Sequence, residues 1–358
     1  MTKSPFIVGV VTMACAMGAA QAQTQAPVTV FGVLDVAYQM NTASGAASQN
    51  LLINDGNTSS RFGFRGVEDL GGGLKASFHF EGAVAPTTGA GGSTNVNNSG
   101  ANFASGLFGR RSTVSLTGSW GELRAGRDYV PTFNNLTVAM HPFGTNGLGN
   151  AGQLFYPVAA GGTTARTNVR ASNSIAYLLP AGAGGLNGHF MVAQGLTGAT
   201  GASADNGNYL GGRLGYAAGP LSLAIASGQT KYNTGDYSQS NFAINYKFGP
   251  AKLMYLYGKN EVGVTNTTVN MIGTQYDLGS GQVRAAYTTL KADKVANDAS
   301  QWTIGYVHDL SKRTALYGNY SVVTNDGVGK TFTVGDGLAP TNAGGNSTGA
   351  QIGIRHSF

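Results

Sequence analysis

Charged residues are scarce in this chain of 358 residues. Lys, Arg, Asp and Glu together make up 11% of the sequence, whereas an ordinary globular protein carries about 25%. Hydrophobic residues reach 42%. A protein that faces water on every side needs more charge, so the composition argues against an ordinary soluble surface. The basic residues behind the formal net charge of +6 are interleaved with apolar ones and form no single patch, which argues against nucleic-acid binding.

Cysteine is almost absent as well. The one thiol, Cys15, lies within residues 1–22, where Lys3 is followed by an apolar run and by a small-x-small motif. This pattern predicts a cleaved signal peptide at 1–22 and an exported mature chain of residues 23–358. A lipoprotein anchored through Cys15 is the alternative, but the residues before it form a poor lipobox. The mature chain then has no thiol for a disulfide, a thiolate metal site or a nucleophile.

Long apolar runs are the third absence. Beyond the predicted signal peptide there is no run of 18 or more apolar residues, so the sequence predicts no transmembrane helix. Backbone groups in lipid must be satisfied internally, and a closed β-barrel is the one spanning structure that does this without helices. The sequence therefore favours a membrane barrel.

Residues 57–82 show the repeating unit of such a barrel. Phe62 and Phe64 alternate with Arg61 and Arg65, and the same alternation continues after a Gly-rich turn. Side chains on a strand point to opposite faces with a period of two, so this segment is predicted to be a hairpin with one apolar and one charged face. The pattern recurs about sixteen times. Besides a first strand from Val28 to Gln39 and the two strands of this hairpin, the predicted strands lie near 108–118, 121–128, 169–179, 185–194, 209–217, 221–230, 238–248, 251–259, 267–277, 281–291, 300–309, 314–323 and 349–358.

The connections between these segments alternate in length, which is typical of outer-membrane barrels with short periplasmic turns and long extracellular loops. The predicted fold is therefore all-β: a sixteen-stranded antiparallel transmembrane β-barrel. The short connections lie near 69–73, 119–121, 218–220, 249–250, 279–281 and 310–312, and the long ones near 41–56, 82–106, 129–168, 195–208, 231–237, 260–266, 292–299 and 324–348.

Aromatic residues gather at the ends of the predicted strands, where rings with a polar tip favour the two water–lipid interfaces. They are Tyr209, Tyr216, Tyr246, Phe248, Tyr255, Tyr257, Trp302, Tyr306, Tyr317 and Tyr320.

Several phrases make the chain resemble a general bacterial porin of the beta-proteobacterial type, a group of trimeric sixteen-stranded outer-membrane porins. The phrases are VFGVLD from Val30, SRFGFRG from Ser60 with EDLGGGL from Glu68, FGRR from Phe108, GSWG from Gly118, NSIAY from Asn173 and the terminal RHSF from Arg355.

The resemblance implies a homotrimer in the Gram-negative outer membrane whose third loop, residues 129–168, folds inward to narrow the channel. It also implies contact with outer-membrane lipid and lipopolysaccharide, with small ions and solutes, and with the barrel-assembly machinery through the C-terminal strand that ends in Phe358. No cofactor or metal is expected.

Family positions also imply a set of basic residues on the wall opposite the third loop: Arg61, an arginine at 110 or 111, and Arg170. Alternation independently places Arg61 and Arg170 on the lumen face. The same alternation adds further lumen residues to the predicted pore constriction, namely Glu81, Lys75 and Arg124.

The two neighbouring arginines present a conflict. Alternation favours Arg111 for the lumen, because it shares its parity with polar residues, whereas the family phrase favours Arg110. A β-bulge would reconcile the two.

The third loop contains no acidic residue after Asp128, and Asn134 and Asn135 stand where a carboxylate is common in relatives. Rings of Arg or Lys favour anion passage, so the predicted function is passive diffusion of small hydrophilic solutes and ions with a preference for anions.

Two alternatives remain at this point. Aromatic residues on the third loop allow a substrate-specific channel for sugar or phosphate. An outer-membrane enzyme would need an acid–base set, and the available candidates form no compact motif. The loop aromatics are Tyr129, Phe133, Phe143, Phe155 and Tyr156, and the acid–base candidates are Asp35, His79, Glu81, His141 and Asp236.

Overall fold

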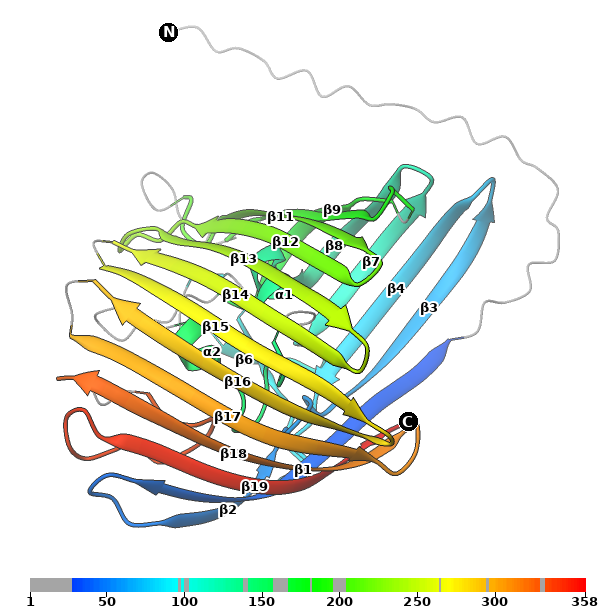
Figure 1. Ribbon diagram of the computed structural model, residues 1–358. Coiled ribbons are helices and arrows are strands. Elements are labelled where there is room, and N and C mark those ends of the chain that lie inside the picture. Colours follow the sequence, from blue (N-terminus) through cyan, green and yellow to red (C-terminus); the bar gives the residue numbers. More distant parts are fainter. Residues whose placement is uncertain are drawn as a thin grey trace, which may run out of the picture.

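The computed structural model describes residues 28–95, 98–99, 103–137, 141–156, 167–180, 182–195, 204–263, 265–293, 296–328 and 332–358. The predicted signal peptide lies outside these residues. The described chain forms a closed antiparallel β-barrel (Figure 1). Its strands are β1 (Thr29–Ala43), β2 (Gln49–Asn54), β3 (Arg61–Gly71), β4 (Leu74–Ala83), β7 (Arg111–Gly118), β8 (Gly121–Tyr129), β9 (Arg170–Leu178), β10 (Leu186–Ala193), β11 (Tyr209–Ala218), β12 (Leu221–Thr230), β13 (Tyr237–Phe248), β14 (Ala251–Val262), β15 (Thr265–Leu278), β16 (Gly281–Ala292), β17 (Asn297–Asp309), β18 (Thr314–Gly327) and β19 (Asn346–Ser357).

Strands β2 and β3 occupy one position in the wall. Both pair with β1, β2 along Val36–Asn41 and β3 along Thr29–Val33. The 17 strands of the sheet therefore occupy sixteen positions around the barrel, as predicted. Between the two strands, residues 55–60 turn away from the ladder, and Ser59 Oγ donates a hydrogen bond to Asn146 Oδ1 at 2.8 Å.

The barrel closes between its first and last strands. β1 pairs with β19 from Val33 opposite Ser357 to Ala43 opposite Ser347. Beyond this ladder, Gly32 and Phe358 exchange two backbone hydrogen bonds of 3.1 and 3.0 Å. Closure removes the free sheet edge, which is not tolerated in lipid.

The two faces of each strand have the polarity that the alternation predicts. On β1, Asp35, Gln39 and Asn41 point into the barrel and are 0% exposed, whereas Leu34 and Tyr38 on the outer face are 42% and 45% exposed. Most of the predicted interfacial aromatics face outward. Tyr209 and Tyr317 are exceptions: they are 5% and 4% exposed and point inward, because each shares the parity of the lumen residues on its strand.

Short turns and long loops alternate as predicted, and a further short connection joins β9 to β10, as the predicted strands 169–179 and 185–194 imply. Several loops are shorter than predicted because the strand ladders run further toward the outside. The predicted loop at 41–56 consists largely of strand, since Gln49–Asn54 pairs with β1. Within the predicted loop at 260–266, β14 runs on to Val262 and β15 already begins at Thr265. The loop at 82–106 contains a small sheet of β5 (Ser93–Asn95) and β6 (Phe103–Ser105).

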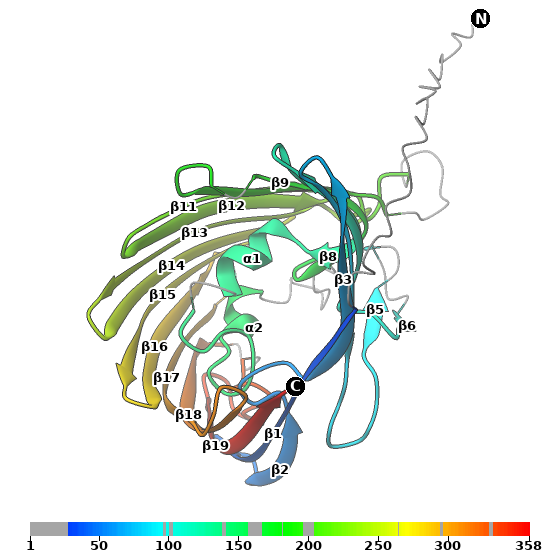
Figure 2. The ribbon, with the colours of Figure 1, turned by 90° about the vertical axis from the view of Figure 1, so that its right-hand side faces the viewer.

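The third loop enters the barrel. Its two helices, α1 (Pro131–Thr137) and α2 (Gly152–Phe155), lie inside the ring of strands (Figure 2). Neither is long and apolar enough to cross a membrane, and the same holds for every helix in the described residues.

Candidate functional site

Glu81 is the centre of one charged cluster on the lumen wall. Arg110 Nε donates to Glu81 Oε1 at 2.6 Å, and Arg61 Nε lies 3.6 Å from Glu81 Oε2. His79 Nε2 lies 3.6 Å from the same oxygen. β4 carries Glu81 and His79, β3 supplies Arg61, and Arg110 stands one residue before β7, so three neighbouring strand positions converge on one carboxylate.

Tyr129 connects this cluster to Arg170 at the base of the third loop. The Tyr129 hydroxyl accepts hydrogen bonds from Arg110 Nη2 at 3.0 Å and from Arg170 Nη2 at 2.9 Å. The Arg170 guanidinium carbon also lies 4.4 Å from the centre of the Tyr129 ring, a cation–π contact. Tyr129 ends β8 and Arg170 begins β9, so these contacts link the two ends of the third loop.

Asp128 organises a second cluster next to the first. Arg111 Nη2 lies 3.2 Å from Asp128 Oδ2, and Arg124 Nη1 donates to the same oxygen at 2.7 Å. Arg124 also donates through Nε to Glu122 at 2.8 Å. Two arginines and two carboxylates thus alternate along β7 and β8.

Alternation and the family phrase disagreed on whether Arg110 or Arg111 faces the lumen. In the structure both guanidinium groups lie on the lumen side. Arg111 is the strand partner of Glu81, while the Arg110 amide donates to the Glu81 carbonyl at 3.0 Å. Two successive residues therefore stand opposite one, which is the local arrangement of a bulge.

Lys75 is not brought together with the other predicted residues. It shares the face of Glu81, but it lies one residue into β4, next to the turn at Gly71–Gly73 and opposite Thr117. Lys75 lies six positions before Glu81 along the strand, a distance of about 20 Å. Alternation gives the face of a strand and not the depth along it, and this is why Lys75 was assigned to the constriction.

Arg65, Arg213 and Arg284 also lie on the lumen face but were not part of the predicted constriction. Alternation had already placed Arg65 on the charged face of its hairpin, and the inward parity of Arg213 and Arg284 could have found these two as well. Arg213 Nε donates to Asn135 Oδ1 of α1 at 3.2 Å, and Arg284 Nη1 donates to Asn57 Oδ1 at 3.2 Å. Within the described residues, no carboxylate lies within 4.0 Å of these three arginines or of Arg170.

Side-chain amides of the wall hold the third loop in place. One amide on each of several strands donates to a loop carbonyl, and Asn241 also accepts a hydrogen bond from Asn135 Nδ2, so the polar groups of an irregular segment inside the barrel find partners. The contacts are Asn241 with Asn135 and with the Thr132 carbonyl, Asn260 with the Phe155 carbonyl, Gln275 with the Pro142 carbonyl, and Gln301 with the Leu148 carbonyl, at 2.7 to 3.2 Å.

Apolar packing also holds the third loop against the wall. Leu148 and Leu154 of the loop are 0% exposed and pack in one cluster with inward residues of the wall, among them Leu256 and Met271. Phe332 and Val334 from the last loop join the same cluster. The third loop is therefore packed both against the wall and against the last loop, and Gln153 Nε2 adds a hydrogen bond to Thr333 Oγ1 at 3.0 Å.

His141 lies in the third loop and not in a spanning strand. Its side chain contacts the rings of Phe143 and Phe155, and burial lowers the pKa of His141 to about 4. The imidazole is therefore neutral at pH 7 and adds no charge to the channel. In the described residues, no group of three or more His, Cys, Asp or Glu side chains is arranged to hold a metal.

A family model of the Gram-negative porins matches residues 10–328. The chain belongs to this family. Outer membrane porin protein 32 of Delftia acidovorans is 38% identical to this porin over 96% of the present chain and 97% of its own. The solved structure of an anion-selective porin from Comamonas acidovorans superimposes with a TM-score of 0.79 at 34% identity, covering 93% of this porin and 100% of that chain. OmpT of Vibrio cholerae shares the fold at 14% identity, with a TM-score of 0.62, over 93% of this porin and 99% of that chain.

Family membership places this porin in the outer membrane of a Gram-negative cell. The apolar outer face is then the face that meets lipid, and the arginine-rich inner face meets water. The two charged clusters and the loop seated opposite them form the candidate pore constriction.

Proposed function

We propose that this porin is a passive, water-filled channel for small hydrophilic solutes and ions, and that it favours anions. The observation that carries the anion preference is the charge of the lumen wall. Arg65, Arg170, Arg213 and Arg284 have no carboxylate within salt-bridge distance in the described chain. Guanidinium groups keep their charge at any working pH, and a focused positive field raises the local concentration of anions. The relative from Comamonas is described as anion-selective.

The geometry gives little support to a sugar-specific channel. Such a channel needs aromatic faces exposed along the lumen, but Phe133, Phe143 and Phe155 are only 6%, 4% and 4% exposed because they pack against the wall. Tyr129 is occupied by the two arginines that bind its hydroxyl.

We also infer that this porin catalyses no reaction. The acid–base candidates of the sequence are engaged in separate structural contacts. Asp35 accepts a hydrogen bond from Tyr317, His141 is buried in the third loop, and Asp236 pairs with Lys231 at the outer rim.

Reversal potentials of single channels in a KCl gradient test the proposed selectivity. The wild-type channel is expected to show the sign of anion preference. Arg61→Ala is expected to shift the potential toward cations by a few-fold in permeability ratio, because partly exposed charges interact with about 0.2–1 kcal/mol. Arg313→Ala, the same change in an exposed periplasmic turn, serves as the matched control. A wild-type potential of cation sign would refute the proposed preference, and an unchanged potential in Arg61→Ala would remove Arg61 from the constriction.

We propose that the porin is a homotrimer that associates through a phenylalanine cluster on its outer face. Phe80 contacts Phe108 and Phe78 with ring centroids 5.0 and 5.7 Å apart, and Phe108 also contacts Phe62 and Phe64 at 6.3 Å. Lipid tails give little hydrophobic drive for association, so interfaces in membranes depend on close packing of this kind.

The double variant Phe64→Ala with Phe108→Ala tests this interface. Truncation of central aromatic residues in interfaces costs about 2 kcal/mol or more each, so we expect the trimer to dissociate in mild detergent. The mass is measured by light scattering of the folded protein. Phe242→Ala, an outward phenylalanine on β13, is the control and is expected to leave the assembly intact. Equal masses for both variants would contradict this interface.

Lipopolysaccharide contact and recognition of the terminal Phe358 by the assembly machinery stay predictions. The ring of Phe358 is accessible to such a partner, because it remains 49% exposed. Only the backbone of Phe358 is engaged with β1, through its pairing with Gly32 where the first and last strands meet.

A further inference from the structure

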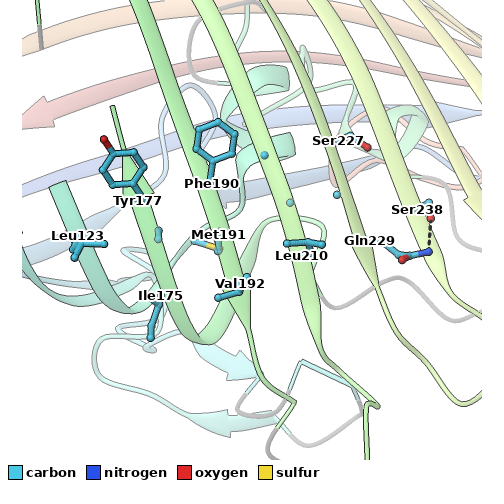
Figure 3. A pocket seen from close by; sticks show the side chains of 14 residues that line it. Leu123, Ile175, Tyr177, Phe190, Met191, Val192, Leu210, Ser227, Gln229 and Ser238 are labelled. Carbon is cyan, nitrogen blue, oxygen red and sulfur yellow. Dashed lines mark hydrogen bonds between the residues drawn. The ribbon is translucent and has the colours of Figure 1, made fainter. Parts of the chain in front are cut away.

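A hollow of about 720 Å³ lies on the outer face of the barrel across β8 to β13 (Figure 3). Its apolar side is formed by Leu123, Ile175, Phe190 and Leu210, whose side chains are 45% to 66% exposed. These are outward positions of their strands, so the hollow opens toward the membrane and not toward the channel.

The floor of the hollow consists of small residues in neighbouring strands. Gly212 stands opposite Ser227, and Ser227 stands opposite Ser240 on β13. Phe190 stands on the other side of Gly212. A Cβ at Gly212 would lie 3.0 Å from the Phe190 ring, so the absent side chain leaves the space beside that ring open.

The end of the hollow nearest the extracellular rim is polar. Gln229 Nε2 donates to Ser238 Oγ at 3.3 Å, as Figure 3 shows. Two ion pairs flank this end: Lys231, two residues beyond Gln229, pairs with Asp236, and Lys259 pairs with Glu261, the strand partner of Ser238. Each lysine contacts an acid at 2.5 Å, but both are 40% or more exposed, and exposed ion pairs are weak enough for another anion to compete.

We propose that this hollow binds one lipid of the outer leaflet, with an acyl chain over the small-residue floor and a phosphate-bearing head beside Gln229, Lys231 and Lys259. The surrounding wall meets the hydrocarbon of the membrane, so an acyl chain is the material that fills the hollow. An empty space would forfeit the dispersion contacts of its lining. The head meets hydrogen-bonding and cationic groups at the one end where the hollow reaches the polar rim.

A second copy of this chain is a poorer occupant. The phenylalanine cluster on β3 and β4 is the face we assign to the trimer, and Figure 2 shows β3 on the opposite side of the barrel from β11, β12 and β13. The hollow also combines an apolar side with a polar end flanked by two exposed lysines and their acids, which matches an amphiphile whose phosphate competes for the lysines.

Native mass spectrometry of the full folded porin, titrated with dioleoylphosphatidylglycerol in a non-ionic detergent, tests the proposal. We expect one tightly held lipid per barrel. Ser227→Trp fills the floor and is expected to weaken binding on the order of tenfold, which corresponds to about 1.4 kcal/mol. The matched control is Thr274→Trp, because Thr274 is an outward position of β15, opposite Leu253, that belongs neither to the hollow nor to the neighbourhood of the two lysines. Equal affinity of the wild type and Ser227→Trp would overturn the proposal.

Two further measurements distinguish the proposed anionic lipid from a zwitterionic lipid and from a second copy of the chain. Dioleoylphosphatidylcholine has the same chains and a zwitterionic head, so it is expected to bind several-fold more weakly; equal binding would overturn the assignment of the head. If Ser227→Trp broke the trimer while Thr274→Trp did not, the hollow would be a contact between chains and not a lipid site. The reversal potential of Ser227→Trp is expected to equal that of the wild type, so this experiment and the test of anion preference fail independently.

Discussion

Replacing Arg110 and Arg170 together by alanine is expected to lower the anion-to-cation permeability ratio of this porin at least fivefold, and up to about thirtyfold at low salt. A unit charge 4 Å from a passing ion contributes about 1 kcal/mol even at the dielectric constant of water, and 1–2 kcal/mol corresponds to a factor of 5–30. Removal of Arg110 also leaves Glu81 with a more distant partner, Arg61 at 3.6 Å, so the carboxylate then attracts cations. Reversal potentials in gradients built on 0.1 M and 1 M KCl measure the effect.

The dependence on salt concentration and a variant that removes a negative charge test this prediction further. The Debye length falls from about 10 Å at 0.1 M to about 3 Å at 1 M, so the effect must shrink in concentrated salt. Glu81→Gln is expected to shift the potential in the opposite direction, because it frees the charge of Arg110. Lys247→Ala removes a cation that is 57% exposed near the periplasmic turn and is expected to have little effect. A double variant that keeps the wild-type potential at low salt would show that ions do not pass this cluster.

Leu154→Asp is expected to release the third loop from the wall and widen the channel. Leu154 is 0% exposed between the loop and the wall. Its burial stabilises the seated loop by about 1.5–3 kcal/mol, and a carboxylate at this position adds a large desolvation cost. Together these shift the equilibrium between seated and released loop by a factor of a hundred or more. Single-channel conductance and the size limit for sugars in liposome swelling are both expected to rise.

Gln153→Asp is the matched control for this prediction. It adds the same charge one residue earlier in α2, at a position that is exposed and faces the last loop instead of the wall. Its conductance is expected to stay near the wild-type level. Gel mobility before and after heating confirms that each barrel has folded. A folded Leu154→Asp channel with normal conductance and an unchanged size limit would show that the loop does not limit the passage.

The strands and their facing were predictable because a half-buried strand has a period of two. The charged face of β3 and β4 could be read directly from Arg61, Phe62 and Phe64, and the same parity assigned Arg124 and Arg170 to the lumen. It also put Arg65 on the charged face, and it could have identified Arg213 and Arg284, which lie at inward positions but belong to no phrase of the family resemblance.

Depth and irregular backbone were not predictable in this way. Lys75 and Glu81 have the same parity, yet only the hydrogen-bond register of β4 with its neighbours shows that one is near the periplasmic turn and the other is in the cluster. Arg110 and Arg111 both face inward because the ladder opposite Glu81 accommodates an extra residue. A strict alternation of faces cannot predict the position of such an insertion.

The sequence by itself determined that this protein is an exported barrel with apolar outside and charged inside, because scarce charge, the missing apolar helix and the strict alternation are local properties of the chain. Only the tertiary structure decided where the third loop lies. Its fixation depends on amides such as Asn260 and Gln301 and on apolar residues such as Leu154 and Met271 that meet across long separations in sequence. Contacts of this kind arise only when closure of the barrel brings distant strands around a common interior.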